Sequence, residues 1–238
     1  FRKDCINNMI KLPATHSNTP APGEGYLEET GLWVRKYAHA DAIPTGQPAL
    51  FLDRDGVIND DVHYLSKPED VVILPGAAEL IAAANKAGVA VVIITNQSGV
   101  GRGYLNWDDF AAVQAKIHQE LAQHSAVWDM VIACPFHAKA KPPYDIPSHP
   151  GRKPNTRMIE IAEQALGIDL GRSWVIGDKA SDVKCGLRAG LQGALYAGTH
   201  EKSLRDEADK ALALATADFP VSAINALSEA LPYIPFLN

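Results

Sequence analysis

The sequence has few cysteines, no excess of positive charge and no long apolar run, and each shortage excludes a class of protein. Its 238 residues include only three cysteines, which form no disulfide framework and suggest a reducing compartment such as the cytoplasm. The formal net charge of -6 disfavours a nucleic-acid partner. No apolar run approaches the ~20 residues of a membrane span and no secretory signal pattern opens the chain. We therefore expect a cytoplasmic protein without a membrane partner, and we expect it to be a monomer.

The stretch that organises the chain begins with an apolar run at residues 49–52 and continues as Asp53-Arg54-Asp55-Gly56. The run is too short for a helix, and polar residues and a glycine follow it, which predicts a buried parallel strand with a loop beyond its carboxyl end. In an extended chain Asp53 and Asp55 point the same way, so their charges repel unless a cation or a proton lies between them. The pair favours Mg²⁺, with Asp53 able to attack phosphorus and Asp55 placed to transfer a proton. An aspartate-rich turn is the alternative interpretation.

Strands and helices alternate along the rest of the chain. Apolar runs predict further strands at residues 89–94, 130–133, 174–176 and 193–196. Helical spacing and capping residues predict helices after Gly76 and Asn106, and at residues 155–166, 182–189, 202–215 and 221–231. Residues 97–103 are rich in glycine and predict a loop. This order indicates an α/β fold, a doubly wound parallel sheet of about five strands with helices on both faces.

The chain divides into two parts of different composition. Residues 1–48 carry many prolines and glycines and little periodicity, so we interpret them as an N-terminal extension of loops and turns, partly ordered around Trp33 and Tyr37. Residues 49–238 carry the alternating pattern and are predicted to form the main domain.

Polar side chains follow the ends of the predicted strands or, for one pair, directly precede a predicted helix. Besides the first aspartate pair, they are Thr95, Asn96, Arg152, Lys153, Asp178, Lys179 and Asp182. The carboxyl ends of parallel strands open on one crevice, so we expect these groups to meet. Carboxylates suit Mg²⁺, while a hydroxyl and a lysine suit a phosphoryl group, whose oxygens gain charge during transfer. Taken singly, Thr95 is equally typical of a strand cap, Lys153 of a solvated loop and Asp182 of a helix N-cap.

Taken in order, these residues resemble the four motifs of the haloacid dehalogenase superfamily of phosphohydrolases. The matching motifs are Asp53-x-Asp55-Gly56-Val57, Thr95-Asn96, Lys153 and Gly177-Asp178-Lys179-x-x-Asp182. The resemblance extends from about residue 49 to about residue 198. The longer strings at residues 51–59, 95–103 and 152–154 are similar, more narrowly, to the D-glycero-D-manno-heptose bisphosphate phosphatases and their histidinol-phosphatase relatives.

This resemblance implies a role for each motif residue. Asp53 would be the nucleophile that becomes an aspartyl phosphate, and Asp55 would be the acid and base. Thr95, Asn96 and Lys153 would bind the phosphoryl group, while Arg102 and Arg152 would either contact the rest of the substrate or face water. Mg²⁺ would be held by Asp53, by the backbone carbonyl of Asp55 and by Asp178, with Lys179 and Asp182 behind them. The implied reaction is Mg²⁺-dependent hydrolysis of a small-molecule phosphate ester, such as a heptose bisphosphate or histidinol phosphate.

The segment at residues 135–154 departs from the family pattern. Its six prolines exclude a helix or central strand and predict a long surface loop. The related phosphatases carry a zinc pattern there, Cys-x-His followed by Cys-x-Cys before Arg-Lys-Pro. This chain keeps Cys134 but has Phe136 in place of the histidine, and His149 and Gly151 in place of the two cysteines. A structural zinc ion needs four closed ligands, so we do not expect zinc on the three candidates that remain, Cys134, His137 and His149.

The spacing of the motifs also bears on the acceptor of the phosphate. Predicted elements already fill the intervals from Asp55 to Thr95 and from Thr95 to Lys153, so we expect no separate cap domain and a site covered by loops alone. Two other functions stay open. A non-catalytic receiver would accept phosphate on Asp53, but it would have no task for an acid and base two residues later. A phosphomutase or phosphotransferase would use Asp55, but an uncapped site favours water as the acceptor.

Overall fold

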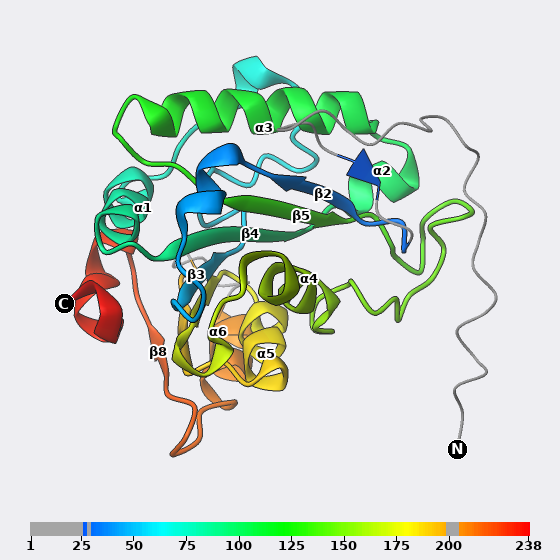
Figure 1. Cartoon of the computed structure of the whole chain (residues 1–238). Helices are drawn as coiled ribbons and strands as arrows, with labels where there is room; N and C mark the ends of the chain where they lie inside the picture. The colour runs from blue at the N-terminus through cyan, green and yellow to red at the C-terminus, as the bar shows by residue number, and fades with distance from the viewer. Residues whose placement is uncertain (1–25, 28–29, 199–204) are drawn as a thin grey trace.

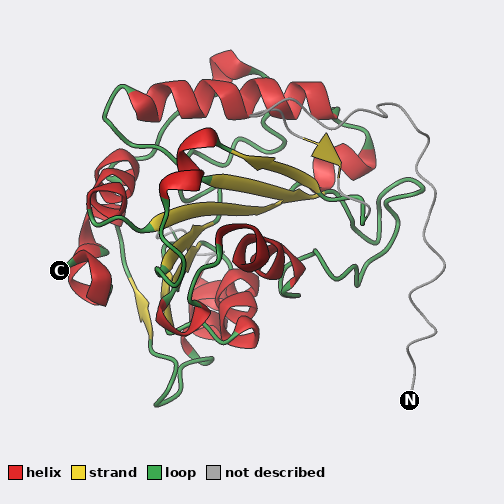
Figure 2. Cartoon of the chain, viewed as in Figure 1, coloured by secondary structure: helices red, strands yellow, loops and turns green. Residues whose placement is uncertain are grey.

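The computed structural model describes residues 26–27, 30–198 and 205–238, and these contain one eight-stranded sheet of order β1-β2-β5-β4-β3-β6-β7-β8 (Figures 1 and 2). The strands are β1 (Tyr26–Leu27), β2 (Trp33–Lys36), β3 (Ala49–Leu52), β4 (Ala90–Asn96), β5 (Met130–Cys134), β6 (Trp174–Gly177), β7 (Gly193–Tyr196) and β8 (Val221–Ala223). Only the β1–β2 and β2–β5 pairs are antiparallel. The predicted α/β class with a doubly wound sheet is confirmed, although the sheet is wider than predicted.

Helices cover both faces of this sheet (Figure 1). They are α1 (Ala77–Lys86), α2 (Ser98–Arg102), α3 (Trp107–Ala122), α4 (Arg157–Leu166), α5 (Ala180–Ala189) and α6 (Arg205–Leu212). Successive residues of a strand point to opposite faces. Leu50 and Leu52 of β3 accordingly enter the core beneath α1 and α3, whereas Phe51 enters the core beneath α4 and α5. No helix among the described residues combines the length and the apolar character needed to cross a membrane.

Helix α3 begins where its sequence predicts. The Asn106 side chain accepts hydrogen bonds from the backbone N–H groups of Asp108 and Asp109, at 2.8 and 2.9 Å. The Asp109 carboxylate returns a bond by accepting from the Asn106 N–H at 2.9 Å, which completes a capping box. The face of α3 that was expected to be apolar is buried, through Phe110, Val113, Ile117 and Leu121.

Strand β3 lies at the point where the winding of the sheet reverses. Its neighbours are β4 on one side and β6 on the other, each parallel to it. At such a switch point the loops beyond the carboxyl ends of the strands diverge and leave a crevice. Between β3 and β4 the chain forms only a short 3-10 helix (Pro68–Asp70), α1 and irregular turns. The crevice therefore lies beyond β3, and loops border it.

The interpretation of residues 1–48 as loops and turns is wrong for Trp33–Lys36, which form β2. This strand pairs with β5 from Trp33↔Ala133 to Lys36↔Met130. The signal is only four residues long, and its backbone hydrogen bonds come from β5, far along the chain, so local patterns could not reveal it. Residues 1–25 and 28–29 lie outside the described part of the chain.

The glycine-rich segment 97–103 is a second correction, because Ser98–Arg102 form the short helix α2. Gly99 and Gly101 are buried against neighbouring groups: a Cβ on Gly101 would lie 2.2 Å from the Pro135 carbonyl oxygen. Here glycine serves close packing of a helix rather than the freedom of a loop.

The helix predicted at residues 221–231 is a third correction. Val221–Ala223 form β8 beside β7, and a 3-10 helix follows at Leu227–Glu229. The apolar side chains of this segment are buried in the same core as those of α1; they are Ile224, Leu227, Ala230 and Ile234. Helix α6 occupies part of the predicted helix 202–215, whose first residues, 202–204, lie outside the described part.

Candidate active site

Asp53 stands directly beyond β3, with its main chain fixed to β6. Its backbone N–H donates to the Ile176 carbonyl at 3.0 Å. The Oδ1 atom accepts from the Arg54 N–H at 2.7 Å and lies 2.9 Å from Lys153 Nζ. The Oδ2 atom receives no hydrogen bond from the described residues. One oxygen of this buried carboxylate is thus held in place, and the other is left for a ligand.

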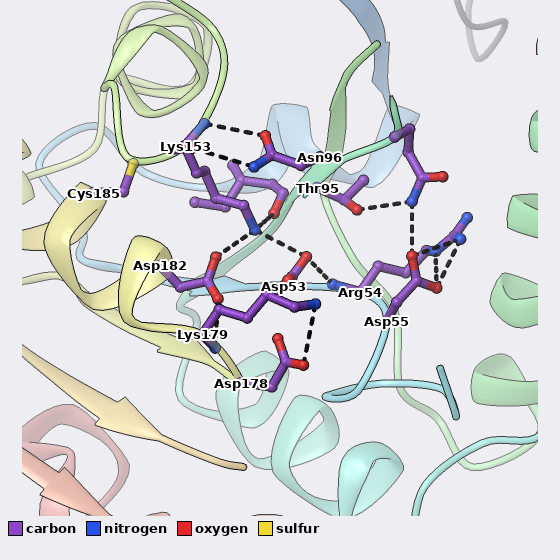
Figure 3. A network of polar contacts seen from close by, with 12 residues as sticks. Asp53, Arg54, Asp55, Thr95, Asn96, Lys153, Asp178, Lys179, Asp182 and Cys185 are labelled. Atoms are coloured by element: carbon purple, nitrogen blue, oxygen red, sulfur yellow. Dashed lines mark hydrogen bonds and ion pairs between the residues drawn. The ribbon is translucent and has the colours of Figure 1, made fainter. Parts of the chain in front are cut away.

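Lys153 is the cation at the centre of the site (Figure 3). Its side chain is 1% exposed, and Nζ lies 2.7 Å from Asp182 Oδ1 and donates to the Ile94 carbonyl at 2.7 Å. Burial alone would lower the pKa of Lys153, but the Asp182 and Asp53 carboxylates outweigh burial and raise it. Asn96 fixes the main chain of the lysine, because its Oδ1 accepts the Lys153 N–H at 3.1 Å and its Nδ2 donates to the Lys153 carbonyl at 3.3 Å. The lysine is therefore charged and rigidly placed.

Three carboxylates gather beside this lysine. Oxygens of Asp53, Asp178 and Asp182 lie within 4.8 Å of one another, and all three residues are buried. Burial, followed by the charge of Asp53, raises the pKa of Asp178 to about 7. The Oδ1 atom of Asp178 is buried and has no hydrogen-bond partner among the described residues. A hard cation with oxygen ligands answers both the excess negative charge and the unpaired oxygen, so these residues fit Mg²⁺.

The loop after β3 approaches this carboxylate group closely. Gly56 has φ +81°, and a Cβ added to it would lie 2.6 Å from Asp178 Oδ2. A side chain at this position would therefore collide with the carboxylate, and its backbone would be strained as well. The close approach of the loop after β3 to the loop after β6 therefore requires glycine at position 56.

Asp182 and Lys179 come from the start of α5. The Asp182 Oδ2 atom accepts from the Lys179 N–H at 3.0 Å, which caps the helix, while burial raises the pKa of Asp182. Lys179 is 48% exposed, and its Nζ lies 3.3 Å from Asp178 Oδ2 and 3.8 Å from Asp61 Oδ2. The interpretation of Asp182 as an N-cap is wrong, because Lys179 is the N-cap and Asp182 is the third residue of α5, from which its side chain reaches back to the Lys179 N–H.

Asp55 lies apart from the carboxylate group, with its side chain toward Arg54 (Figure 3). Arg54 donates from Nε and Nη2 to the two Asp55 oxygens, each at 2.9 Å. Asn59 Nδ2 donates at 3.0 Å and Gln97 Nε2 at 2.8 Å. Burial would raise the pKa of Asp55, but the charge of Arg54 and the hydrogen bonds outweigh burial and lower it. Asp55 is thus held as a carboxylate able to accept a proton, and metal binding through its backbone carbonyl stays a prediction.

Thr95 presents a hydroxyl at the end of β4. It is 1% exposed, and its Oγ1 accepts from Gln97 Nε2 at 2.9 Å, which leaves the hydroxyl proton to donate to a ligand. Gln97 therefore links Thr95 to Asp55. The phosphate contacts expected of Thr95, Asn96 and Lys153 stay predictions.

Sequence reasoning missed three residues that hold Asp55, namely Arg54, Asn59 and Gln97. Arg54 is 1% exposed, and its Nη1 donates to Gln114 Oε1 at 3.2 Å. Its guanidinium carbon lies 5.3 Å from the centre of the Phe110 ring. A signal was present, because Gln114 follows Phe110 by four residues and thus lies on the apolar face of α3, where a buried amide needs a polar partner.

The pocket that these residues surround has a volume of about 200 Å³. Its lining combines the ends of β3, β4 and β6 with the loop at residues 61–65. Of the predicted site residues, it is lined by Asp53, Asp55, Thr95, Asn96, Lys153, Lys179 and Asp182. The residues that sequence places far apart are therefore brought to one hollow.

Arg102 and Arg152 lie outside that lining but next to it. Arg102 Nη1 donates to the hydroxyl of Tyr64, a pocket residue, at 2.6 Å, and Arg152 Nη1 donates to the Phe136 carbonyl at 2.9 Å. Burial, followed by the charges of Arg152 and Arg102, lowers the pKa of His137, which lies between them. Neither arginine forms an ion pair with a carboxylate among the described residues. We call Arg102, Arg152 and His137 the arginine corner; its positive charge has no carboxylate partner among the described residues.

The proline-rich loop, residues 135–154, is held by rings and hydrogen bonds. The His149 and Phe136 rings stack with centroids 3.6 Å apart and an angle of 5°. His149 Nδ1 accepts from the Gly151 N–H at 3.0 Å, and Nε2 lies 3.1 Å from the Thr30 carbonyl oxygen. A carbonyl only accepts, so Nε2 carries the proton, and neither nitrogen is left for a metal. Cys134 is a buried free thiol whose pKa is raised to about 12 by burial.

Comparisons with known proteins agree with this geometry. Residues 151–220 match the HAD-hydrolase-like family. A D-glycero-beta-D-manno-heptose-1,7-bisphosphate 7-phosphatase from Mesorhizobium japonicum is 45% identical over 186 residues, which are 78% of this chain and 83% of the relative. The chain belongs to the haloacid dehalogenase-like phosphatases. It is therefore a phosphoric monoester hydrolase, and the receiver interpretation is set aside.

Further relatives of these HAD-like phosphatases resemble the chain. A D-glycero-D-manno-heptose-1,7-bisphosphate 7-phosphatase from Chlorobaculum tepidum is 40% identical, over 66% of this chain and 83% of the relative. A crystal structure from Mesorhizobium loti, whose name assigns it to the HAD-like phosphatases, has a TM-score of 0.79 and 36% identity, covering 90% of this chain and 96% of that one. The D,D-heptose 1,7-bisphosphate phosphatase of B. bronchiseptica, complexed with magnesium and phosphate, has a TM-score of 0.63 and 26% identity, covering 76% and 94%.

Proposed function

We propose that this phosphatase hydrolyses one phosphate of a sugar bisphosphate, such as D-glycero-D-manno-heptose 1,7-bisphosphate, through an aspartyl phosphate on Asp53. The observation that carries the proposal is the unequal treatment of the two Asp53 oxygens. Oδ1 is held by Lys153 and the Arg54 N–H, while Oδ2 receives no hydrogen bond from the described residues. A carboxylate oxygen that lines a pocket and has no hydrogen-bond partner is free to act as the nucleophile.

In the first step Oδ2 of Asp53 attacks phosphorus, and the bond between phosphorus and the sugar oxygen breaks. Asp55, two residues along, first takes up a proton from solvent as the substrate displaces its Arg54 contacts, and it then gives this proton to the departing oxygen, so the sugar leaves as an alcohol. The Arg54 contacts favour the charged form of Asp55, so we expect substrate binding to loosen them. In the proposal, the Thr95 hydroxyl donates to a phosphoryl oxygen, and Lys153 exchanges its Asp53 contact for a second one as charge grows on these oxygens.

In the second step water attacks the aspartyl phosphate and gives its proton to Asp55. The bond between Asp53 and phosphorus breaks, inorganic phosphate leaves, and both aspartates return to their starting states. Mg²⁺, bound at Asp53, Asp178 and the backbone carbonyl of Asp55, would neutralise phosphoryl charge in both steps. Lys179 and Asp182 lie behind these ligands in the proposal, and zinc has no part in it.

The unbalanced arginines support a substrate with a second anionic group. Arg102 and Arg152 have no carboxylate partner among the described residues. Burial is the main cause of the lowered pKa of Arg152, and the nearby charge of Arg102 lowers it further. Each guanidinium is suited to grip phosphate with two donors. A cationic far end, as in histidinol phosphate, would be repelled there. The proposal places the enzyme in carbohydrate metabolism, acting alone in the cytoplasm on a small-molecule ester.

Phosphate release from matched sugar phosphates tests this proposal. With Mg²⁺ present, we expect kcat/KM for the heptose 1,7-bisphosphate to exceed that for the corresponding 7-monophosphate by at least about tenfold, the worth of one charge-assisted hydrogen bond. The double variant Arg102→Ala/Arg152→Ala is expected to lose this preference and to keep turnover of the monophosphate. Equal rates for both esters in the wild type would contradict the bisphosphate assignment.

A further inference from the structure

The loop that borders the pocket holds two residues in a backbone conformation that side chains rarely adopt. His63 has φ 39° and Tyr64 has φ 68°, and both line the pocket. Left-handed conformations cost energy for residues other than glycine, and they persist where the surrounding contacts enforce them, often at ligand sites. The Tyr64 side chain is therefore aimed by its backbone.

Contacts on both sides fix the Tyr64 ring. Its centroid lies 4.7 Å from that of Tyr104 and 4.4 Å from that of His63. On the side of α2, a Cβ added to Gly99 would lie 2.7 Å from Tyr64 Cδ1, so the ring packs directly on the helix backbone. Tyr64 is thus a rigid aromatic wall of the pocket rather than a mobile surface side chain.

The hydroxyl of Tyr64 joins the pocket to the arginine corner. It accepts from Arg102 Nη1 at 2.6 Å, and the guanidinium carbon lies 5.8 Å from the centre of the tyrosine ring. A tyrosine hydroxyl that accepts one bond still has a proton to donate. The other anchor of Arg102 is the His137 ring, which lies 3.1 Å from Nη2, while the buried Nε has no partner among the described residues. Loss of the Tyr64 hydroxyl would leave the arginine with one anchor.

We propose that Tyr64 is a specificity-determining residue, which rests on the proposed function. Its ring packs against the carbon skeleton of the ester, and its hydroxyl holds Arg102 toward the remote anionic group. The site then favours esters that carry a ring-sized carbon skeleton and a second negative charge. Esters too small to reach Tyr64 would react at a rate that does not depend on this residue.

Two variants of Tyr64 separate the ring from the hydroxyl. Tyr64→Phe keeps the ring, and Tyr64→Asn removes it while using a residue that tolerates left-handed backbone. Tyr104→Phe is the matched control, because Tyr104 is 61% exposed and packs on the outer side of Tyr64. Each protein is assayed for kcat and KM with a sugar bisphosphate, its monophosphate and acetyl phosphate, and circular dichroism checks the fold.

For Tyr64→Phe we expect KM for the bisphosphate to rise about fivefold to tenfold with kcat little changed, and the constants for acetyl phosphate to stay as in the wild type. Tyr64→Asn should also raise KM for the monophosphate. Tyr104→Phe should leave KM unchanged for both the bisphosphate and the monophosphate. If the wild type prefers the bisphosphate but the Tyr64 variants have the same KM for it, the Tyr64 proposal is overturned and the proposed function is not. An equal loss of activity toward acetyl phosphate and toward the bisphosphate would have the same meaning. A wild type that turns over acetyl phosphate but no sugar phosphate overturns the proposed substrate and the Tyr64 proposal together.

Discussion

The two charged regions of the site are built in opposite ways. Around Lys153, the side chains of Asp53, Asp178 and Asp182 bring three buried carboxylates to one buried ammonium group. In the second region, Arg102 of α2 and Arg152 of the proline-rich loop have no carboxylate partner among the described residues. One region has too much negative charge and the other too much positive charge. In the proposed function, Mg²⁺ would balance the charge of the first region, and a second anionic group of the substrate would balance the charge of the second.

The same contrast separates how the regions are held. Asp53 and Asp178 directly follow strands of a parallel sheet, where neighbouring strands fix the main chain, and Asp182 lies in the first turn of α5. The proline-rich loop has no strand pairing, and it depends on the Phe136–His149 stack and on single hydrogen bonds. We therefore expect substitutions in the first region to abolish chemistry and substitutions in the second to change recognition or stability.

The largest effect is expected for Asp53→Asn. An amide cannot attack phosphorus, so turnover should fall by more than ~10³-fold while the fold persists. Phosphate release and circular dichroism measure the two outcomes, with the exposed Asp70→Asn as the control for the same chemical change. If Asp53→Asn kept about a tenth of wild-type activity, another group would have to be the nucleophile.

Asp55→Asn should come next, and its effect should depend on the leaving group. A sugar alkoxide needs a proton, so turnover of sugar phosphates should fall by roughly 10²–10⁴-fold. An aryl phosphate has a leaving group that is stable without protonation, so its first step should slow far less. Rapid mixing should then show a burst of phenol followed by slow phosphate release. Equal losses for both esters and no burst would reduce Asp55 to a structural carboxylate.

The strand-end motifs explain why this first region was predictable from sequence. Asp53 and Asp178 follow β3 and β6, Thr95 lies at the carboxyl end of β4 before the loop, and Lys153 precedes α4. The parallel sheet brings such ends to one edge. The buried partners of Asp55 were not predicted, because Arg54 is bound by side chains from distant elements such as Gln114 of α3. Strands β2 and β8 were missed for a related reason: they are short and gain their hydrogen bonds from β5 and β7, which no local pattern encodes.

The next effect is on stability and compares two lysines of the pocket. Lys153→Met would leave buried carboxylates without a partner, so we expect a loss of about 3–5 kcal/mol in the free energy of unfolding. Lys179→Met removes a lysine whose side chain is 48% exposed, so a loss below about 1 kcal/mol is expected. Denaturant titration of both variants without metal measures the difference. Equal losses would mean that Lys153 is not the electrostatic centre of the pocket.

In the proline-rich loop, His149→Ala should cost about 2–3 kcal/mol, from a lost ring stack and two lost hydrogen bonds. The exposed His124→Ala should cost little. Thermal melts of the two variants provide the comparison. Elemental analysis would reveal the outcome that contradicts this prediction. Stoichiometric zinc that is released only on unfolding would mean that a metal, and not the ring stack, shapes this loop.

The smallest effect concerns the metal and pH. A carboxyl group whose pKa is higher in the folded than in the unfolded protein contributes to stability at pH values below its unfolded-state pKa. This contribution is lost as the pH rises through the folded-state pKa. Because the pKa of Asp178 is raised to about 7, the metal-free protein should lose stability as pH rises through that value. Added Mg²⁺ should offset the loss and restore activity after EDTA. Melting curves that have the same pH dependence with and without Mg²⁺ would place the metal away from these carboxylates.

The central claim is that Asp53 becomes covalently phosphorylated, and trapping that intermediate tests it most directly. Asp55→Asn, mixed with an aryl phosphate and Mg²⁺ and quenched in acid during the burst, is digested and mapped by mass spectrometry. We expect a single phosphorylated peptide with the phosphoryl group on Asp53, and none in Asp53→Asn treated alike. A phosphoryl group on another residue, or a burst of phenol without any labelled peptide, would contradict the account.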